Sequence, residues 1–129
     1  DGAHVVVDFD GEPNRPLAER REKFPALRDV AGMMRSFADL RGTLERADTS
    51  GKTRADWLAW EDELRAAFMA AYRDRLDTGD LRLVPEAQED LENGLTALEL
   101  DKAIYEVGYE MATRPDWVAL PLARLVRTR

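Results

Sequence analysis

The sequence has no cysteine and only one histidine, His4, among its 129 residues. Without cysteine the chain can form no disulfide framework and offers no thiolate for catalysis or metal binding. A single histidine excludes a metal site built from several histidines, and it argues against a histidine-based catalytic triad within this chain. These two absences remove thiol chemistry and histidine clusters from consideration.

Positive charge is also in short supply, because 19 lysines and arginines face 26 acidic residues, which gives a net charge of −7 and a pI of about 4.8. A nucleic-acid-binding surface needs a basic face, so we expect no nucleic-acid partner. No apolar run approaches the length that spans a bilayer, and no signal peptide is apparent. We therefore expect a cytoplasmic protein with no membrane partner.

One convincing strand lies near the start of the chain, where Val5–Val7 form a β-branched run. Three carboxylates follow at alternate positions, Asp8, Asp10 and Glu12, and Gly11 ends the strand among them. Carboxylates at a strand end beside a glycine turn suit Mg²⁺, which prefers oxygen ligands and retains phosphates as co-ligands. The simpler alternative is a strand that leaves the core through a polar turn.

This strand lacks a partner within the sequence. Residues 1–4 are typical of a hairpin turn that leads into it, but an isolated hairpin is only marginally stable and no second convincing strand follows. We therefore expect the partner strand to lie upstream. The 129 residues, 44% of them hydrophobic, then predict the C-terminal part of a larger protein.

The remainder of the chain is patterned for helices. Apolar residues at helical spacing predict helices over 27–48, 53–76 and 86–113, followed by an apolar C-terminal segment over 118–127. The predicted fold class is therefore mainly α, with one short N-terminal β-hairpin or strand. The residues that we expect to be buried together are Val30, Met34, Phe37, Leu64, Phe68, Leu98 and Ile104.

Two glycines fall inside these helices. Gly32 lowers helix stability relative to alanine, by roughly 1 kcal/mol, so it indicates either a close approach by a neighbouring backbone or a tolerated weakness. Gly94 predicts a kink or a short break within the last long helix.

One face of that helix carries Lys102, Tyr105, Glu106 and Tyr109, at spacings i, i+3, i+4 and i+7. Tyrosine rings pack on the apolar face of a sugar, and charged groups form hydrogen bonds with its hydroxyls. This stripe is therefore a candidate carbohydrate site. An equally weighted alternative is a surface Lys–Glu pair beside two partly buried tyrosines.

Several segments, in order along the chain, resemble bacterial maltokinases. These enzymes often occur fused to trehalose synthase, and they belong to the eukaryotic-like kinase group that includes aminoglycoside phosphotransferases. The segments that carry the resemblance are Asp8-Phe9-Asp10-Gly11-Glu12-Pro13, Arg15 to Arg21, Leu27 to Phe37, Leu100 to Glu110, Arg114-Pro115-Asp116-Trp117-Val118 and Leu120-Pro121-Leu122.

The resemblance implies an ATP-dependent kinase that converts maltose to maltose 1-phosphate for glucan synthesis. It implies that residues 1–129 are the helical C-terminal lobe of a protein-kinase-like fold. The family's catalytic loop, H-G-D-x-H-x-x-Q, and its nucleotide-binding lobe do not occur in this sequence. We therefore expect no activity from these residues alone, and the implied partners are maltose or a similar sugar, ATP, the N-terminal lobe and a fused or associated trehalose synthase.

The resemblance also implies roles for single residues. Asp8 corresponds to the aspartate that holds Mg²⁺ against the ATP phosphates. Asp10 occupies a position where maltokinases usually carry glutamate, so its role as a second metal ligand stays open. Asp29 corresponds to a buried aspartate that supports the catalytic loop. The sugar-contacting positions correspond to Lys102, Tyr105, Glu106 and Tyr109.

Two other functions remain open. Glucosamine kinases of the same group also carry an Asp-Phe-Asp-Gly turn, and Asp10 favours a sugar such as glucosamine, whereas Glu12-Pro13 and Arg15–Arg21 favour maltose. The other alternative is a non-catalytic helical interaction module with an acidic surface and an aromatic core.

Overall fold

The computed structural model describes residues 11–76 and 83–126. Within these ranges the chain forms helices and no strand, which confirms the mainly α prediction. The expected strand, His4, Asp8 and Asp10 lie outside the described residues. The elements, in order, are α1 (Leu17–Arg20), α2 (Leu27–Ala47), α3 (Arg54–Leu76), α4 (Gln88–Thr113), the 3-10 turn η1 (Pro115–Trp117) and α5 (Ala119–Val126).

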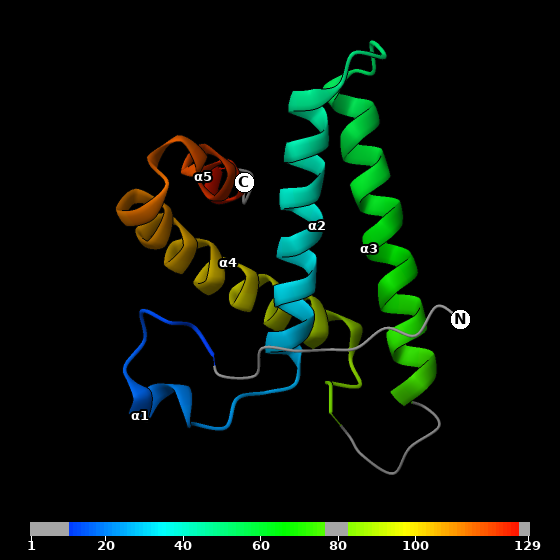
Figure 1. Ribbon diagram of the computed structural model, residues 1–129. Coiled ribbons are helices and arrows are strands. Elements are labelled where there is room, and N and C mark those ends of the chain that lie inside the picture. The colour runs from blue at the N-terminus through cyan, green and yellow to red at the C-terminus, as the bar shows by residue number, and fades with distance from the viewer. Residues whose placement is uncertain (1–10, 77–82, 127–129) are drawn as a thin grey trace, which may run out of the picture.

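Helix α2 is the centre of the arrangement. It packs side by side with α3 as an antiparallel pair, and it crosses α4 on another side (Figure 1). Pro115 ends α4 because proline cannot continue the helix, and the chain then turns back so that α5 packs against α4. None of the helices in the described ranges is both long and apolar enough to cross a membrane.

The apolar core joins α2 to the start of α4. Leu27, Val30 and Met34 project from α2 at helical spacing and are buried together with Leu91 of α4. Half-buried side chains close around this cluster, among them an edge-to-face pair of Phe37 and Phe68 whose ring centroids are 5.7 Å apart. The half-buried group is Phe37, Phe68, Met69, Tyr72, Val84, Leu95 and Leu98. The prediction that Val30 and Met34 are core residues is therefore confirmed.

Ile104 was expected in this core, and that expectation is wrong, because its side chain is 62% exposed. The neighbouring Ala103 is fully buried instead, so α4 presents to α2 a face rotated by about one position from the predicted one. The same face buries Glu99 and Glu110. Leu64 is half-buried. The spacing of apolar residues could not predict that α4 buries two glutamates, Glu99 and Glu110.

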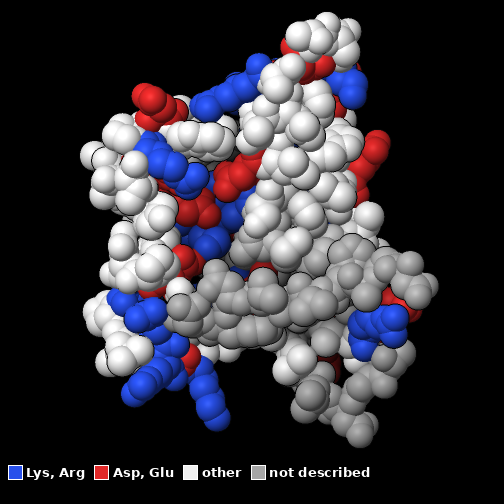
Figure 2. Space-filling model, viewed as in Figure 1, with Lys and Arg blue, Asp and Glu red and all other residues white. Residues whose placement is uncertain are grey.

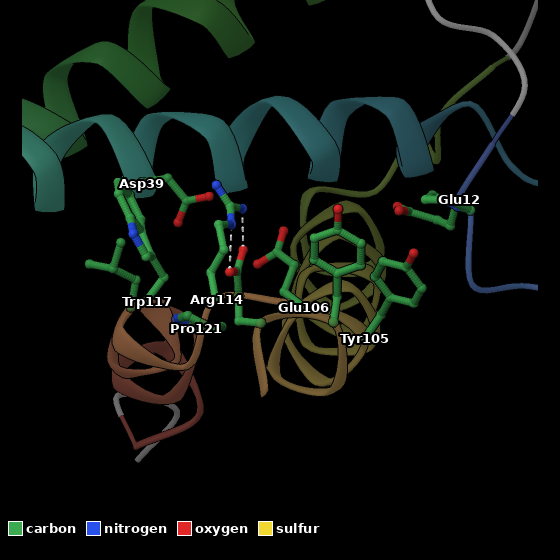
Figure 3. Close-up of a pocket in the computed structure, with 11 residues that line it drawn as sticks. Glu12, Asp39, Tyr105, Glu106, Arg114, Trp117 and Pro121 are labelled. Carbon is green, nitrogen blue, oxygen red and sulfur yellow. Dashed lines mark hydrogen bonds and ion pairs between the residues drawn. The ribbon is translucent and has the colours of Figure 1, made fainter. Parts of the chain in front are cut away.

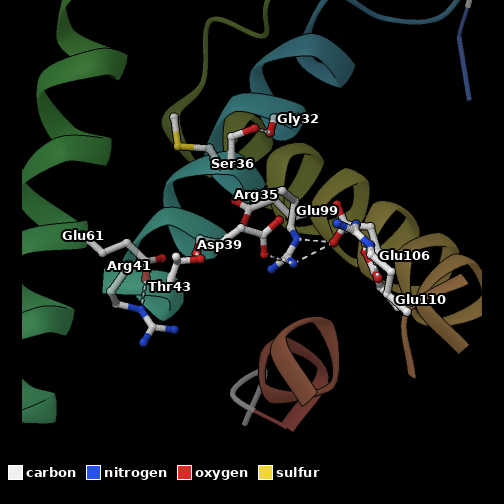
Figure 4. Close-up of polar contacts among 12 residues, drawn as sticks. Gly32, Arg35, Ser36, Asp39, Arg41, Thr43, Glu61, Glu99, Glu106 and Glu110 are labelled. Atoms are coloured by element: carbon white, nitrogen blue, oxygen red, sulfur yellow. Dashed lines mark hydrogen bonds and ion pairs between the residues drawn. The ribbon is translucent and has the colours of Figure 1, made fainter. Parts of the chain in front are cut away.

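Arginine–glutamate pairs with buried glutamates connect the three long helices. Arg41 of α2 donates from Nε to Glu61 of α3 at 2.7 Å, and Arg65 of α3 donates to Glu99 of α4 at 2.5 and 3.1 Å. The free-energy cost of desolvating two buried charges offsets much of their mutual attraction. Removing one partner, however, leaves a buried charge unpaired and is strongly destabilising. These pairs therefore favour one relative arrangement of the helices (Figure 4).

The break expected at Gly94 is not found, whereas Gly32 fits the second of its two interpretations, a tolerated weakness. Helix α4 continues through Gly94 without a break. At Gly32 an added Cβ would lie 3.9 Å from Lys102 Cε, which is an ordinary contact, so none of the described residues approaches closely there. The close approach is at Gly42, where an added Cβ would lie 2.5 Å from Leu120 Cδ2 of α5. Gly42 is thus the position that lets α5 pack on α2.

Candidate functional site

A cleft of about 440 Å³ lies where α2, α4, η1 and α5 meet. Figure 2 shows acidic and basic side chains gathered in a hollow between α2 on one side and α4 with α5 on the other. The cleft opens toward the segment before α1, which contributes Glu12 and Pro13 (Figure 3). Its lining residues are Glu12, Pro13, Asp39, Tyr105, Glu106, Tyr109, Glu110, Arg114, Trp117, Leu120 and Pro121.

Three of the four residues in the predicted sugar-binding stripe line this cleft. Tyr105 and Tyr109 stack with their ring centroids 6.3 Å apart and form an aromatic wall, and Glu106 stands beside them (Figure 3). Lys102 is not part of the lining. Its ammonium binds Glu12 Oε1 at 2.5 Å, which holds the segment before α1 against α4.

That segment is attached to α4 by further contacts. The Asn14 backbone N–H donates to the Tyr105 hydroxyl at 3.3 Å, and Arg15 donates to Asp101 at 2.9 Å. The Arg15 guanidinium also lies 5.4 Å from the centroid of the Tyr105 ring, within the range of a cation–π interaction. Residues that directly follow the predicted metal turn in sequence are therefore fixed beside the predicted sugar stripe.

Arg35 links the two sides of the cleft. Its side chain is 2% exposed and donates from Nε and Nη2 to Glu106 Oε2 at 2.9 and 2.6 Å. Nη2 also donates to Asp39 Oδ1 at 3.1 Å, so one guanidinium joins a carboxylate of α4 to a carboxylate of α2 (Figure 4). Both bonds to Glu106 end on Oε2, and within the described residues Oε1 accepts no hydrogen bond.

Burial shapes the protonation of these carboxylates. It raises the pKa of Glu106 above the ordinary glutamate value, and the charge and hydrogen bonds of Arg35 offset part of that rise. Burial likewise raises the pKa of Asp39, and the nearby Glu110 raises it further. Glu110 is itself paired with Arg114 through two hydrogen bonds of 2.9 and 2.5 Å, and this pairing raises the pKa of Arg114.

The cleft carries a surplus of negative charge. Among the described residues, four carboxylates line it and three cations are bonded to them, Arg35, Lys102 and Arg114. With all of these groups ionised, one negative charge remains. An acidic cleft with an aromatic wall suits a small polar ligand that brings a positive charge and an apolar face.

Asp29 does not line the cleft, and the predicted metal ligands lie outside the described residues. Asp8 and Asp10 precede the described residues, and the described ranges contain no group of three or more acidic or histidine side chains that could hold a metal ion. Asp29 was expected to be buried, but it is exposed on the first turn of α2, because the neighbouring positions Leu27 and Val30 face the core. Its support of a catalytic loop stays a prediction.

Sequence reasoning missed several lining residues, notably Asp39, Glu110, Arg114 and Trp117. One signal was present, because Arg35 follows Met34 inside the buried stripe of α2 and needs an acidic partner there. Asp39 lies four residues after Arg35, at the spacing of a helical ion pair.

The chain is similar in sequence to part of two curated kinases. No family model matches the chain. It is 35% identical over 126 residues to a glucosamine kinase of Mycolicibacterium smegmatis, an alignment that covers 96% of this chain and 29% of that protein. It is also 35% identical over 127 residues to a glucosamine kinase of Streptacidiphilus jiangxiensis, with coverage of 94% and 26%.

These relatives are sugar kinases. The chain spans less than a third of the length of the curated relatives that it matches. The similarity supports a relationship to sugar kinases and favours the glucosamine alternative over maltose, for which it provides no support.

Proposed function

We propose that this chain is the acceptor-binding part of a kinase that phosphorylates glucosamine or a closely similar amino sugar. Two independent observations support the proposal. The chain is similar to part of two glucosamine kinases. The cleft combines an aromatic wall with one surplus negative charge, and this is the observation on which the proposal chiefly rests.

The chemistry of the cleft fits an amino sugar better than a neutral disaccharide. A protonated amine forms charge-assisted hydrogen bonds with carboxylates, which are about twice as strong as neutral ones. Glu106 has one oxygen, Oε1, without a partner among the described residues and can accept such a bond. Tyr105 and Tyr109 offer ring faces to the apolar side of the sugar. Maltose would bring no charge to balance the surplus.

Phosphoryl transfer itself requires groups beyond those in the cleft. ATP supplies the phosphate, and Mg²⁺ supplies charge neutralisation on its oxygens. We propose Asp8, with Asp10 as a second ligand, for the metal. The base that activates the sugar hydroxyl belongs to the H-G-D-x-H type of loop, which does not occur in these 129 residues. In this proposal the described residues bind and orient the acceptor and shield it from water.

A substrate panel tests the proposal. The complete polypeptide that carries this segment should be assayed with ATP, Mg²⁺ and glucosamine, N-acetylglucosamine, glucose or maltose. Acetylation removes the positive charge and keeps the ring, so we expect kcat/KM to fall by about ten- to a hundredfold, the equivalent of one charged hydrogen bond. A higher kcat/KM for maltose than for glucosamine would contradict the proposal and support a maltokinase. Failure to phosphorylate any of these sugars would contradict the proposal and favour the alternative of a non-catalytic helical interaction module.

A further inference from the structure

Arg35 has an unusual position for a cation, because it is almost fully buried and yet belongs to the wall of a polar cleft. It reaches from the middle of α2 to Glu106 on α4 and to Asp39 on α2 with the same guanidinium group. Glu106 and Asp39 both line the cleft, whereas Arg35 does not. Arg35 therefore lies behind the two carboxylates and not in contact with the cleft contents (Figure 4).

We propose that Arg35 is a positioning residue for acceptor binding, which holds Glu106 and Asp39 ionised and aimed at the same ligand. The inference rests on the proposed function, because it assumes that Glu106 binds the sugar. It adds a residue that has no direct contact with the substrate. Figure 3 shows Asp39 and Glu106 among the residues that line the cleft, and Figure 4 shows the Arg35 guanidinium next to both of them.

The charges that face Glu106 show why such a residue is needed. Asp39 from α2 and Glu110 from α4 add negative charge. Lys102 and Arg114 are positive, but they are bonded to Glu12 and Glu110, respectively. The lining residues from η1 and α5 are uncharged, namely Trp117, Leu120 and Pro121. Among the described residues, Arg35 is thus the cation that bonds directly to Glu106.

Without that cation, two carboxylates on facing walls of a half-buried cleft would repel each other. Burial already favours the protonated form of each, and one of them would take up a proton or turn away. A protonated Glu106 would lose the charge that holds an ammonium group. Arginine suits the role because its planar fork bonds two carboxylates at once and does not lose its proton, whereas lysine is a single point charge.

The pH dependence of sugar binding separates this role from a merely structural one. Binding requires ionised Glu106, so kcat/KM for glucosamine should fall as pH drops through the pKa of Glu106. Arg35 lowers this pKa through its charge and hydrogen bonds, so Arg35→Gln should move the acid limb of the pH profile to higher pH. The negative charge of Asp39 raises the pKa of Glu106, so Asp39→Asn should move the acid limb of the pH profile to lower pH. Damage to the fold would not produce shifts of opposite sign.

Arg41 provides a matched control. It is also a buried arginine of α2, and it bonds Glu61 across a helix interface, but it lies away from the cleft. Arg41→Gln should destabilise the protein to a similar degree and leave the acid limb in place. The assays use the complete polypeptide, with circular dichroism to show that each variant is folded.

The outcomes separate the two proposals. A wild-type protein inactive on every amino sugar overturns the proposed function and this inference with it. An active wild type whose acid limb is unmoved by Arg35→Gln overturns the inference alone. Should Arg35→Gln not fold, Arg35→Lys carries the test: it keeps the charge but lacks the planar fork that fixes the direction of both carboxylates, so KM for glucosamine should rise about tenfold with kcat little changed. An unchanged KM would overturn the inference.

Discussion

Lys102 and Glu106 lie four residues apart on α4, yet within the described structure they do not pair with each other. Lys102 binds Glu12, and Glu106 binds Arg35. Lys102 and Glu106 could have formed an ordinary surface ion pair, but each is bonded to a different segment of the chain. One residue attaches the segment that follows the predicted metal turn, and the other joins α4 to α2. This division leaves Tyr105, Glu106 and Tyr109 on the wall of a cleft.

Glu106 gives the most direct test of the cleft. Glu106→Gln keeps the shape of the side chain but removes its charge, so a bound ammonium group would lose a charge-assisted partner. We expect the Michaelis constant for glucosamine to rise about ten- to a hundredfold, from a loss of about 1.5–3 kcal/mol. The Michaelis constant for ATP should be nearly unchanged. Steady-state kinetics on the complete polypeptide measures both.

Glu92→Gln is the matched control for this substitution. Glu92 is exposed near the start of the same helix and bonds only Gln88 among the described residues. Glu92→Gln should leave the Michaelis constants for glucosamine and for ATP unchanged. A Glu106→Gln variant that weakens ATP and sugar equally would indicate a folding defect, and one that weakens neither would remove Glu106 from the site.

The same residue predicts a pH dependence of stability. Because burial raises the pKa of Glu106 in the folded state, the folded protein keeps a proton at pH values where the unfolded chain has lost it. The free energy of unfolding contributed by this group is therefore lost as pH rises from the ordinary glutamate range through the raised pKa. Glu106→Gln has no such group. The stability advantage of the wild type over this variant should shrink as pH rises from the ordinary glutamate range, about pH 4, through the raised pKa of Glu106.

Urea unfolding of the full chain at a series of pH values measures this advantage. The salt concentration is held constant, because screening alters the attraction of Arg35. If the advantage grows with pH, the attraction of Arg35 exceeds the cost of burial, and the pKa of Glu106 is lowered in the folded state.

The sequence was a good guide where burial is apolar. Periodicity placed α2, α3 and α4 close to their observed bounds, and it identified Val30 and Met34 as core residues. It also identified the face of α4 that carries Tyr105 and Tyr109. Such features depend on the spacing of residues within one helix, which the sequence states directly.

Contacts between charged residues on different helices could not be predicted in the same way. Arg35 is buried and Arg65 is half-buried, and each bonds a glutamate far along the chain that no spacing within one helix could point to. This is also why Ile104 was misplaced, because Glu99 and Ala103 take the interior face of α4. Asp39 became part of the cleft only when α2 and α4 were brought together.

Asp8 is the residue that the proposal assigns to the metal, and it can be tested without structural detail. Asp8→Asn retains the size of the side chain but removes the charge that Mg²⁺ needs. In the complete polypeptide we expect kcat to fall by orders of magnitude while the dissociation constant for glucosamine barely changes. Kinetics over a range of Mg²⁺ concentrations, with calorimetry for sugar binding, would measure both. Near-normal turnover at ordinary Mg²⁺ would exclude Asp8 from the site.

Gly42 and Gly32 make a matched pair on α2, because both are interior helical glycines with different neighbours. At Gly32 there is room for a methyl group, so Gly32→Ala should stabilise the full chain by about 0.5–1 kcal/mol through helix propensity. At Gly42 the methyl group would meet Leu120 of α5, and relieving that overlap should cost about 1–3 kcal/mol. Gly42→Ala should therefore be the less stable variant in urea unfolding.

The two variants should also differ at the cleft. Leu120 lines it, so a methyl group at position 42 that displaces Leu120 should raise the Michaelis constant for the sugar, whereas Gly32→Ala should not. Steady-state kinetics of both variants in the complete polypeptide measures this difference. Equal stabilities and equal Michaelis constants would mean that Leu120 rotates aside at little cost and that α5 does not depend on a bare backbone at Gly42.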